Sequence, residues 1–228
     1  SKSHYAIIKT YPDDGYASIS TTGFAFLGMG DDWHPIAGMD GMVALASIYV
    51  PLDGMNEKGL CISDLIEIDG STEVPDTDKA DLTIVAAIRL VLDYAKDTEE
   101  AVKLLSEYDV FPSVNAAHHL AISDINNHNV VVEWKNGQMR VTETDIVTNH
   151  CLAEPLESPM TGESYRRFAK LTEMHSGFIS QKEGLQALKE ASYEEETLWS
   201  VIYDKEELSS TIYFDRKWDE PLSFRIKD

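Results

Sequence analysis

The sequence of 228 residues has few cysteines and few positive charges. Cys61 and Cys151 are its two cysteines and no CxxC pair occurs, which argues against a disulfide scaffold or a structural zinc site and favours a reducing, cytoplasmic location. The 19 Lys and Arg residues stand against 40 Asp and Glu, which gives a net charge of −21. Such a surface repels phosphate backbones and anionic lipid headgroups, so neither nucleic acid nor a membrane surface is expected as a partner.

Long apolar runs and the common catalytic motifs are also missing. Nothing approaches the roughly 18 consecutive apolar residues that a membrane-spanning helix needs, and no apolar signal-peptide segment opens the sequence. A glycine-rich phosphate loop, HExxH and GxSxG do not occur, which argues against nucleotide-binding proteins, zincins and α/β-hydrolases. With 43% hydrophobic residues, the chain fits one large domain over residues 1–228 with a substantial core.

The clearest structural pattern in the sequence lies in residues 117–151. Apolar and polar residues alternate here, for example over 130–134, with the period of half-buried strands. Asn136-Gly137 interrupts the alternation, and an Asn-Gly pair between such segments is a strong hairpin signal because both residues tolerate positive φ. We therefore predict a β-meander whose last strand, near 139–147, runs out at Asn149.

The rest of the chain is predicted to form strand blocks and pairs of helices. Apolar residues at i, i+3 and i+4 and capping residues indicate four helices: 82–95, a second one capped by Asp97 with Glu100 at the reciprocal position, 165–175 and 181–191. Apolar runs and alternation indicate strands at 3–9, 16–20, 42–50, 60–68, 197–203, 210–214 and 223–226. The nearly continuous apolar run 42–50 is expected to pair antiparallel with 60–68 through a turn at 54–59, and the acidic residues 69–81 are expected to form a loop.

The resulting order is strands, two helices, strands, two helices and strands. Strand blocks joined by hairpins favour antiparallel sheets with the helices on their outer faces. We therefore predict an α+β fold, a four-layer αββα sandwich of two antiparallel sheets between helix layers. A doubly wound parallel fold does not fit, because single helices would alternate with single strands.

Three histidines and both cysteines are the residues that could bind a metal or act as a nucleophile and its base. His118 and His119 cannot place both rings on one face of a strand, and no third ligand stands at metal spacing, so neither a metal nor a cofactor is expected. Cys61 lies in an apolar strand, where a thiol usually behaves as a small hydrophobic group. Cys151 beside His150 could form an internal nucleophile and base, but adjacent residues on an extended segment point to opposite sides.

Asn149 is a stronger candidate for a catalytic residue than either cysteine. A neutral amide can donate a hydrogen bond to a developing oxyanion without titrating, and the alternative is that Asn149 merely ends a strand or caps a turn. Arg166 and Arg167 head a helix, and we expect one to point inward and the other to solvent.

Taken together, five segments resemble the choloylglycine hydrolase and penicillin V acylase family, linear-amide C–N hydrolases of the N-terminal-nucleophile superfamily. They are DGMNEKGL at 53–60, LAISD at 120–124 continuing to VVVE at 130–133, VTN at 147–149, SYRRF at 164–168 and TLWSVIYD at 197–204. The resemblance implies the αββα fold of that superfamily, a small-molecule N-acyl amide substrate and a tendency to form homo-oligomers. Among its substrates are conjugated bile salts and penicillin V, and the sequence does not choose between them.

The resemblance also implies a mechanism. A mature N-terminal Cys attacks the amide carbon while its own α-amine acts as general base, since the pKa of that amine lies near neutrality. Asn149 would be the oxyanion donor and Arg167 would steady the surroundings of the nucleophile. Where the family often has Asn or Tyr, this sequence has Leu65 or Ile66.

The nucleophile itself is expected upstream of anything in this sequence, because the family motifs arrive too soon for Ser1 to take its place. We therefore expect the chain to lack its first strand and turn, to depend on a short N-terminal peptide that carries the Cys, and to be inactive alone. The alternative is a catalytically inactive family member that binds an amphipathic acyl ligand.

Overall fold

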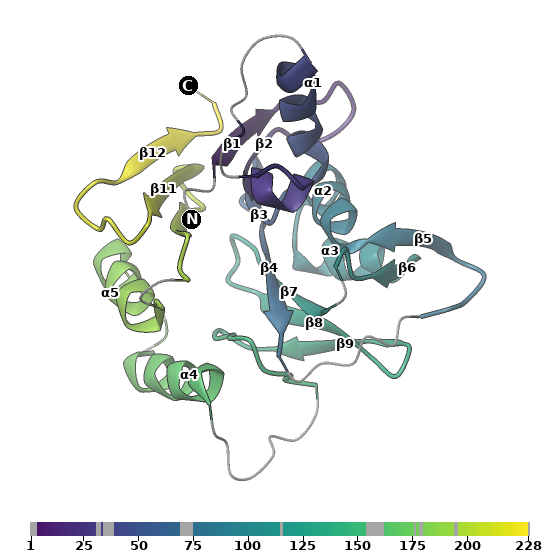
Figure 1. The fold of residues 1–228 in the computed structure, drawn as a ribbon. Coiled ribbons are helices and arrows are strands. Elements are labelled where there is room, and N and C mark those ends of the chain that lie inside the picture. Colours follow the sequence, from purple (N-terminus) through teal and green to yellow (C-terminus); the bar gives the residue numbers. More distant parts are fainter. Residues whose placement is uncertain are drawn as a thin grey trace.

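The computed structural model describes residues 4–30, 33, 39–68, 75–114, 116–153, 162–175, 177, 180–193 and 196–227. Its centre is a seven-stranded sheet with the strand order β1-β2-β3-β4-β7-β8-β9, in which every neighbouring pair is antiparallel (Figure 1). The strands are β1 (Tyr5–Thr10), β2 (Ser18–Gly23), β3 (Asp53–Asn56), β4 (Cys61–Glu67), β7 (Ala117–Ser123), β8 (Asn129–Lys135) and β9 (Gln138–Glu143).

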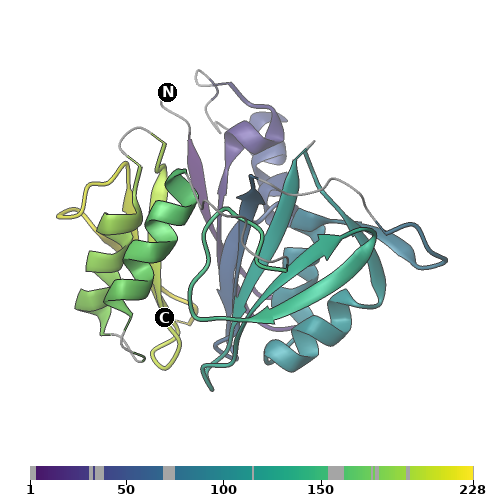
Figure 2. The ribbon, with the colours of Figure 1, turned by 90° about the horizontal axis from the view of Figure 1, so that it is seen from below.

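A smaller antiparallel sheet lies against one face of the large one. It contains β10 (Trp199–Asp204), β11 (Ser209–Phe214) and β12 (Leu222–Arg225). In Figure 2 the green helices α4 (Glu163–Met174) and α5 (Gln181–Ala191) lie beside this yellow sheet, and the teal helices lie on the far side of the large sheet. The predicted α+β fold of two antiparallel sheets with helices outside them is confirmed.

The helices on the far side are α2 (Ile84–Tyr94) and α3 (Thr98–Leu105). The apolar stripe of α2 is fully buried against the large sheet. Asp97 caps α3 by accepting a hydrogen bond from the Glu100 N–H at 2.9 Å, as predicted. Asn56 of β3 ties the end of α2 to the sheet by donating hydrogen bonds to the carbonyls of Leu92 and Ala95.

A separate pair of parallel strands, β5 (Ala80–Thr83) and β6 (Tyr108–Phe111), is present in addition to the predicted antiparallel sheets. Of the loop predicted over 69–81, residues 69–74 lie outside the described part of the chain.

The predicted β-meander is confirmed. β7, β8 and β9 follow one another as antiparallel neighbours. Asn136 and Gly137 form the tight turn between β8 and β9 with φ of 51° and 68°, so both occupy the left-handed region that the Asn-Gly signal predicted. β9 ends at Glu143, earlier than expected, and the chain continues to Asn149 without a strand.

The strand predicted over 42–50 is wrong. That segment contains α1 (Met39–Ala46) and the short 3-10 helix η2 (Ser47–Tyr49). An apolar run of this length does not separate a buried strand from a helix, and the run is not buried, since Met42, Leu45 and Tyr49 are all more than 60% exposed. The strand predicted over 60–68 is confirmed as β4. It pairs antiparallel with β7 and with β3, and β3 lies inside the segment predicted as a turn.

The small sheet covers the large one over β1, β2 and β3. Ile226 packs there on Ile19 and Met55, and Asp53 accepts hydrogen bonds from Trp199 Nε1 at 2.7 Å and from Tyr203 Oη at 2.5 Å. No helix among the described residues is long and apolar enough to cross a bilayer.

Candidate active site

A groove of about 750 Å³ lies on the inner face of the large sheet, beside the small sheet. Ser63 of β4 and Ala121 and Ser123 of β7 line it, and their small side chains point away from α2 and α3. Residues 202–206 of β10 and its following turn, residues of α5, and residues 144–147 form its walls. The groove is therefore bounded by both sheets and by the segment that leads to Asn149.

Asn149 is tied to the end of β4 by two hydrogen bonds. The N–H of Ile68 donates to the Asn149 carbonyl oxygen at 2.7 Å, and Asn149 Nδ2 donates to the Ile66 carbonyl oxygen at 2.8 Å. The side chain is half-buried. A strand end thus supports Asn149 without enclosing it, which is the kind of rigid support that a hydrogen-bond donor in an active site needs.

Arg167 reaches Asn149 from α4. Its Nη2 donates to Asn149 Oδ1 at 2.8 Å, and its guanidinium lies 4.5 Å from the centre of the Tyr193 ring. Arg167 is buried, whereas Arg166 is exposed and forms an ion pair with Glu163 of the same helix. The expected inward and outward placement of the two arginines is confirmed; the catalytic roles of Asn149 and Arg167 stay predictions.

These contacts determine which way the Asn149 amide faces. An arginine can only donate hydrogen bonds, so the atom beside Arg167 must be the amide oxygen. A carbonyl oxygen can only accept, so the atom beside Ile66 O must be the amide nitrogen. The amide nitrogen carries two hydrogens. One is donated to the Ile66 carbonyl oxygen, so the second can be donated to a ligand.

His150 anchors the same segment to α4. Its Nδ1 lies 2.9 Å from Ser164 Oγ and 3.1 Å from Thr148 Oγ1, and its ring stacks on Tyr165 at 4.3 Å between centroids. The residues on either side of Asn149 are thus buried and bonded. This anchoring limits the freedom of Asn149.

Cys61 does not have the surroundings of a nucleophile. Burial raises the pKa of the Cys61 thiol to about 12, so the reactive thiolate is scarce at neutral pH. Cys151 is buried, and the neighbouring His150 ring is engaged with α4.

The comparison that decides the family covers most of the chain. The family model for acyl-coenzyme A:6-aminopenicillanic acid acyl-transferase matches residues 10–218. The chain belongs to this acyl-transferase family. The relationship to choloylglycine hydrolases and penicillin V acylases that the five sequence segments predicted is thereby confirmed.

Solved structures with the same fold include two of these enzymes. A variant of conjugated bile acid hydrolase from Clostridium perfringens superposes with a TM-score of 0.64 at 15% identity, over 99% of this chain and 85% of that one. Penicillin V acylase from Agrobacterium tumefaciens gives a TM-score of 0.61 at 17% identity, over 87% of this chain and 66% of that one. No curated protein matched the sequence. At these identities the structures establish the fold of this acyl-transferase family member.

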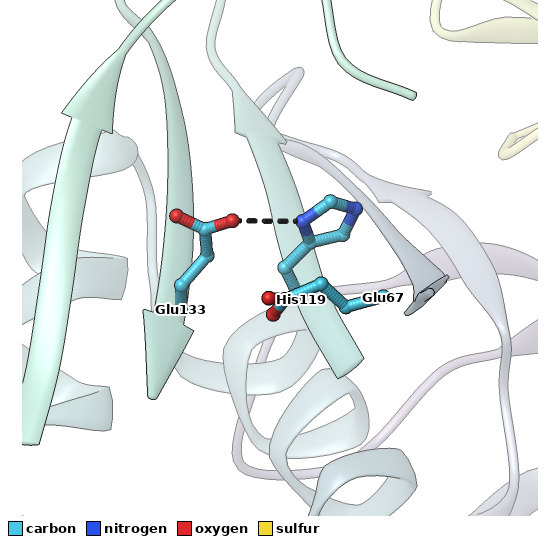
Figure 3. Close-up of side chains that lie close together, drawn as sticks. All are labelled: Glu67, His119 and Glu133. Carbon is cyan, nitrogen blue, oxygen red and sulfur yellow. Dashed lines mark hydrogen bonds and ion pairs between the residues drawn. The ribbon is translucent and has the colours of Figure 1, made fainter. Parts of the chain in front are cut away.

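The structure of this acyl-transferase family member also brings together charged residues that sequence reasoning missed. Glu67, His119, Glu133 and Lys135 lie buried on the inner face of β4, β7 and β8 (Figure 3 labels the first three). His118 and His119 do point to opposite faces, as expected, and His118 pairs with Asp64 at 2.9 Å. The sequence offers no local signal for this cluster, because the strand register is what brings its members together.

Proposed function

We propose that this chain forms the larger part of an enzyme that hydrolyses linear amide C–N bonds with a cysteine nucleophile supplied by an N-terminal segment outside these 228 residues. The observation that carries the proposal is the Asn149 amide, held by Arg167 and by the Ile66 carbonyl so that its N–H group is the available donor. Membership of an acyl-transferring family supports the reaction class.

The proposed reaction has two stages. The cysteine sulfur forms a bond to the amide carbon while the α-amine takes the thiol proton. Asn149 Nδ2 donates a hydrogen bond to the oxyanion, and collapse of the tetrahedral intermediate breaks the C–N bond as the amine leaves with that proton. Water then attacks the thioester carbon, the C–S bond breaks, and the acid is released.

The groove supports a place for the nucleophile-bearing segment. Its lining by Ser63, Ala121 and Ser123 leaves space above the inner face of the large sheet. β10 pairs with β11 on one side, and among the described residues no strand pairs with its other edge. An extended segment along that edge would gain main-chain hydrogen bonds and would pass residues 144–147, close in sequence to Asn149.

The same groove favours a second candidate function. A cavity of about 750 Å³ is in the range of small-molecule sites, so a catalytically inactive protein that binds an amphipathic acyl ligand is the alternative. Conjugated bile acids and penicillin V, the compounds for which the similar structures are named, are the first ligands to try.

The test compares the protein from its natural source with the 228-residue chain alone. Intact-mass measurement of the natural protein is expected to reveal an N-terminus, or an accompanying peptide, that begins with Cys. That material should release the amine from penicillin V or a glycine-conjugated bile acid, and the chain alone should not. Turnover by the chain alone that Cys151→Ala abolishes would overturn the proposal, and binding without turnover in both forms would favour the alternative.

A further inference from the structure

Three buried side chains converge on the inner face of the large sheet, independently of the proposed hydrolysis. Glu67 comes from β4, His119 from β7 and Glu133 from β8, and one donor atom of each lies within 4.8 Å of the other two. Figure 3 shows the Glu133 carboxylate turned toward His119, with the Glu67 side chain crossing toward them. Their exposures are 3%, 0% and 0%.

Each carboxylate has one oxygen that is held and one that is not. Glu67 Oε1 lies 2.7 Å from Lys135 Nζ, and Glu133 Oε1 accepts from the Leu152 N–H at 2.8 Å and lies 3.1 Å from His119 Nδ1. The second oxygen of Glu67 and that of Glu133 are buried without a hydrogen-bond partner, as is Nε2 of the histidine.

A buried polar atom without a partner costs about 1–3 kcal/mol, so the two unpartnered carboxylate oxygens, one from each glutamate, call for an explanation. Outer partners that hold one atom of a ligating side chain while another faces the ion are a usual feature of metal sites. Here Lys135 contacts Glu67 and the Leu152 N–H contacts Glu133, as such outer partners would.

We propose that Glu67, His119 and Glu133 form a binding site for a divalent transition-metal ion of the Zn²⁺ type. One imidazole nitrogen and two carboxylate oxygens are a donor set that zinc accepts. Mg²⁺ and Ca²⁺ suit the site less, because they require about six or more oxygen ligands, several of them usually waters.

The charge of the cluster supports a cation. Two carboxylates face one ammonium, so with a neutral His119 the buried group has an excess negative charge. A proton on His119 would also balance the charge, and it is the competing explanation that the experiment must separate.

A metal here would join three strands to the segment that carries Asn149. The Leu152 N–H bonded to Glu133 lies three residues beyond Asn149 in the chain. We therefore expect the ion to raise the melting temperature of the full chain, whether or not the protein hydrolyses amides.

The test starts from the full chain stripped with EDTA and dialysed against Zn²⁺ at a controlled free concentration. Elemental analysis is expected to count one zinc ion per chain, and isothermal titration is expected to give a saturable affinity. His119→Gln and Glu133→Gln should weaken binding by at least about a hundredfold, because losing even an outer partner of a ligand typically costs about ten- to a hundredfold.

His118→Gln is the matched control. His118 is a buried histidine paired with the carboxylate of Asp64, next to His119 in sequence but on the opposite face of β7. The His118→Gln variant should bind zinc as tightly as the unaltered chain. The site would be overturned if this control lost as much zinc affinity as His119→Gln. It would also be overturned if the unaltered chain bound less than one zinc ion, or bound zinc no more tightly than His119→Gln; a proton would then be the balancing charge.

Should the His119 and Glu133 variants fail to fold, Co²⁺ titration of the unaltered chain gives a second readout. A tetrahedral site with nitrogen and oxygen ligands is expected to produce intense visible d–d absorption that saturates at one equivalent. Absorption with only the weak intensity of hydrated Co²⁺ would overturn the proposal.

Discussion

Arg167 donates from Nη2 to Asn149 Oδ1 at 2.8 Å, joining α4 to the segment that follows β9. The two residues come from different elements and meet in a half-buried place. Because the arginine selects the amide oxygen, it also determines that the amide nitrogen is the group presented to a ligand. The pair therefore acts as a unit, and its members should have different consequences when removed.

Asn149→Ala should leave the protein folded and strongly lower kcat in the protein that carries its nucleophile. Loss of one oxyanion donor typically costs about 3 kcal/mol of transition-state stabilisation, roughly a hundredfold in rate or more. Steady-state kinetics on an N-acyl amide and circular dichroism measure the two effects. Asn126→Ala, in an exposed turn, is the control. An unchanged kcat would show that Asn149 only ends the segment.

Arg167→Ala should lower the free energy of unfolding by about 1–3 kcal/mol, because it leaves a half-buried amide oxygen without its donor and removes the contact with Tyr193. Urea denaturation measures this loss. Arg166→Ala is the matched control and should leave the urea midpoint unchanged, since its ion pair with Glu163 is exposed. Equal losses in both variants would contradict the structural difference between the arginines.

The pH dependence of stability should report Asp53, which is buried between the sheets. Burial raises its pKa more than the hydrogen bonds from Tyr203 and Trp199 lower it, so the pKa is raised overall. Between the ordinary value of 3.8 and the raised value, the folded state holds the proton more tightly than the unfolded state. Ionisation of Asp53 therefore lowers stability as pH rises through this window.

Asp53→Asn removes that proton equilibrium. Relative to the unaltered chain, the variant should gain stability as pH rises from about 4 and then reach a plateau above the raised pKa. Urea denaturation of both proteins across this range measures the difference. A variant that loses relative stability with rising pH would mean that the pKa of Asp53 is lowered in the folded state.

Gly54→Ala should destabilise the large sheet by about 1–3 kcal/mol, the usual cost of overpacking. A Cβ at this position would lie 2.7 Å from Leu92 Cδ1 and 2.8 Å from the Ile19 carbonyl oxygen, and a carbonyl in a neighbouring strand cannot easily retreat. Gly30→Ala, with open space around it, is the control for thermal denaturation. Equal melting temperatures for the two variants would contradict the close approach.

Elements with a complete local signal were predictable from the sequence. The helix at Gln181–Ala191 was found with its bounds, and the Asp97 cap with its partner Glu100. The hairpin at Asn136 and Gly137 also depends on residues that lie next to each other. In each case the deciding interaction spans a few residues, so the sequence contains all of it.

Elements whose local signal was ambiguous were decided by packing. The apolar run at 42–50 suits a strand and a helix equally, and its exposed residues do not line a core. The segment at 53–59 looked like a turn because of Gly54 and Gly59, yet β3 forms within it. There Gly54 allows close approach of Leu92 to the sheet, which only the helix above it reveals.

The candidate sites show the same division. Asn149 could be singled out because an amide after a strand suggests an oxyanion donor by its chemistry alone, and its partner Arg167 was identified through a family resemblance. Glu67, His119 and Glu133 gave no signal, because their neighbours in sequence point to the opposite face of the sheet. Residue type and local spacing are properties of the sequence, whereas convergence across three strands depends on register, and only the tertiary structure fixes that register.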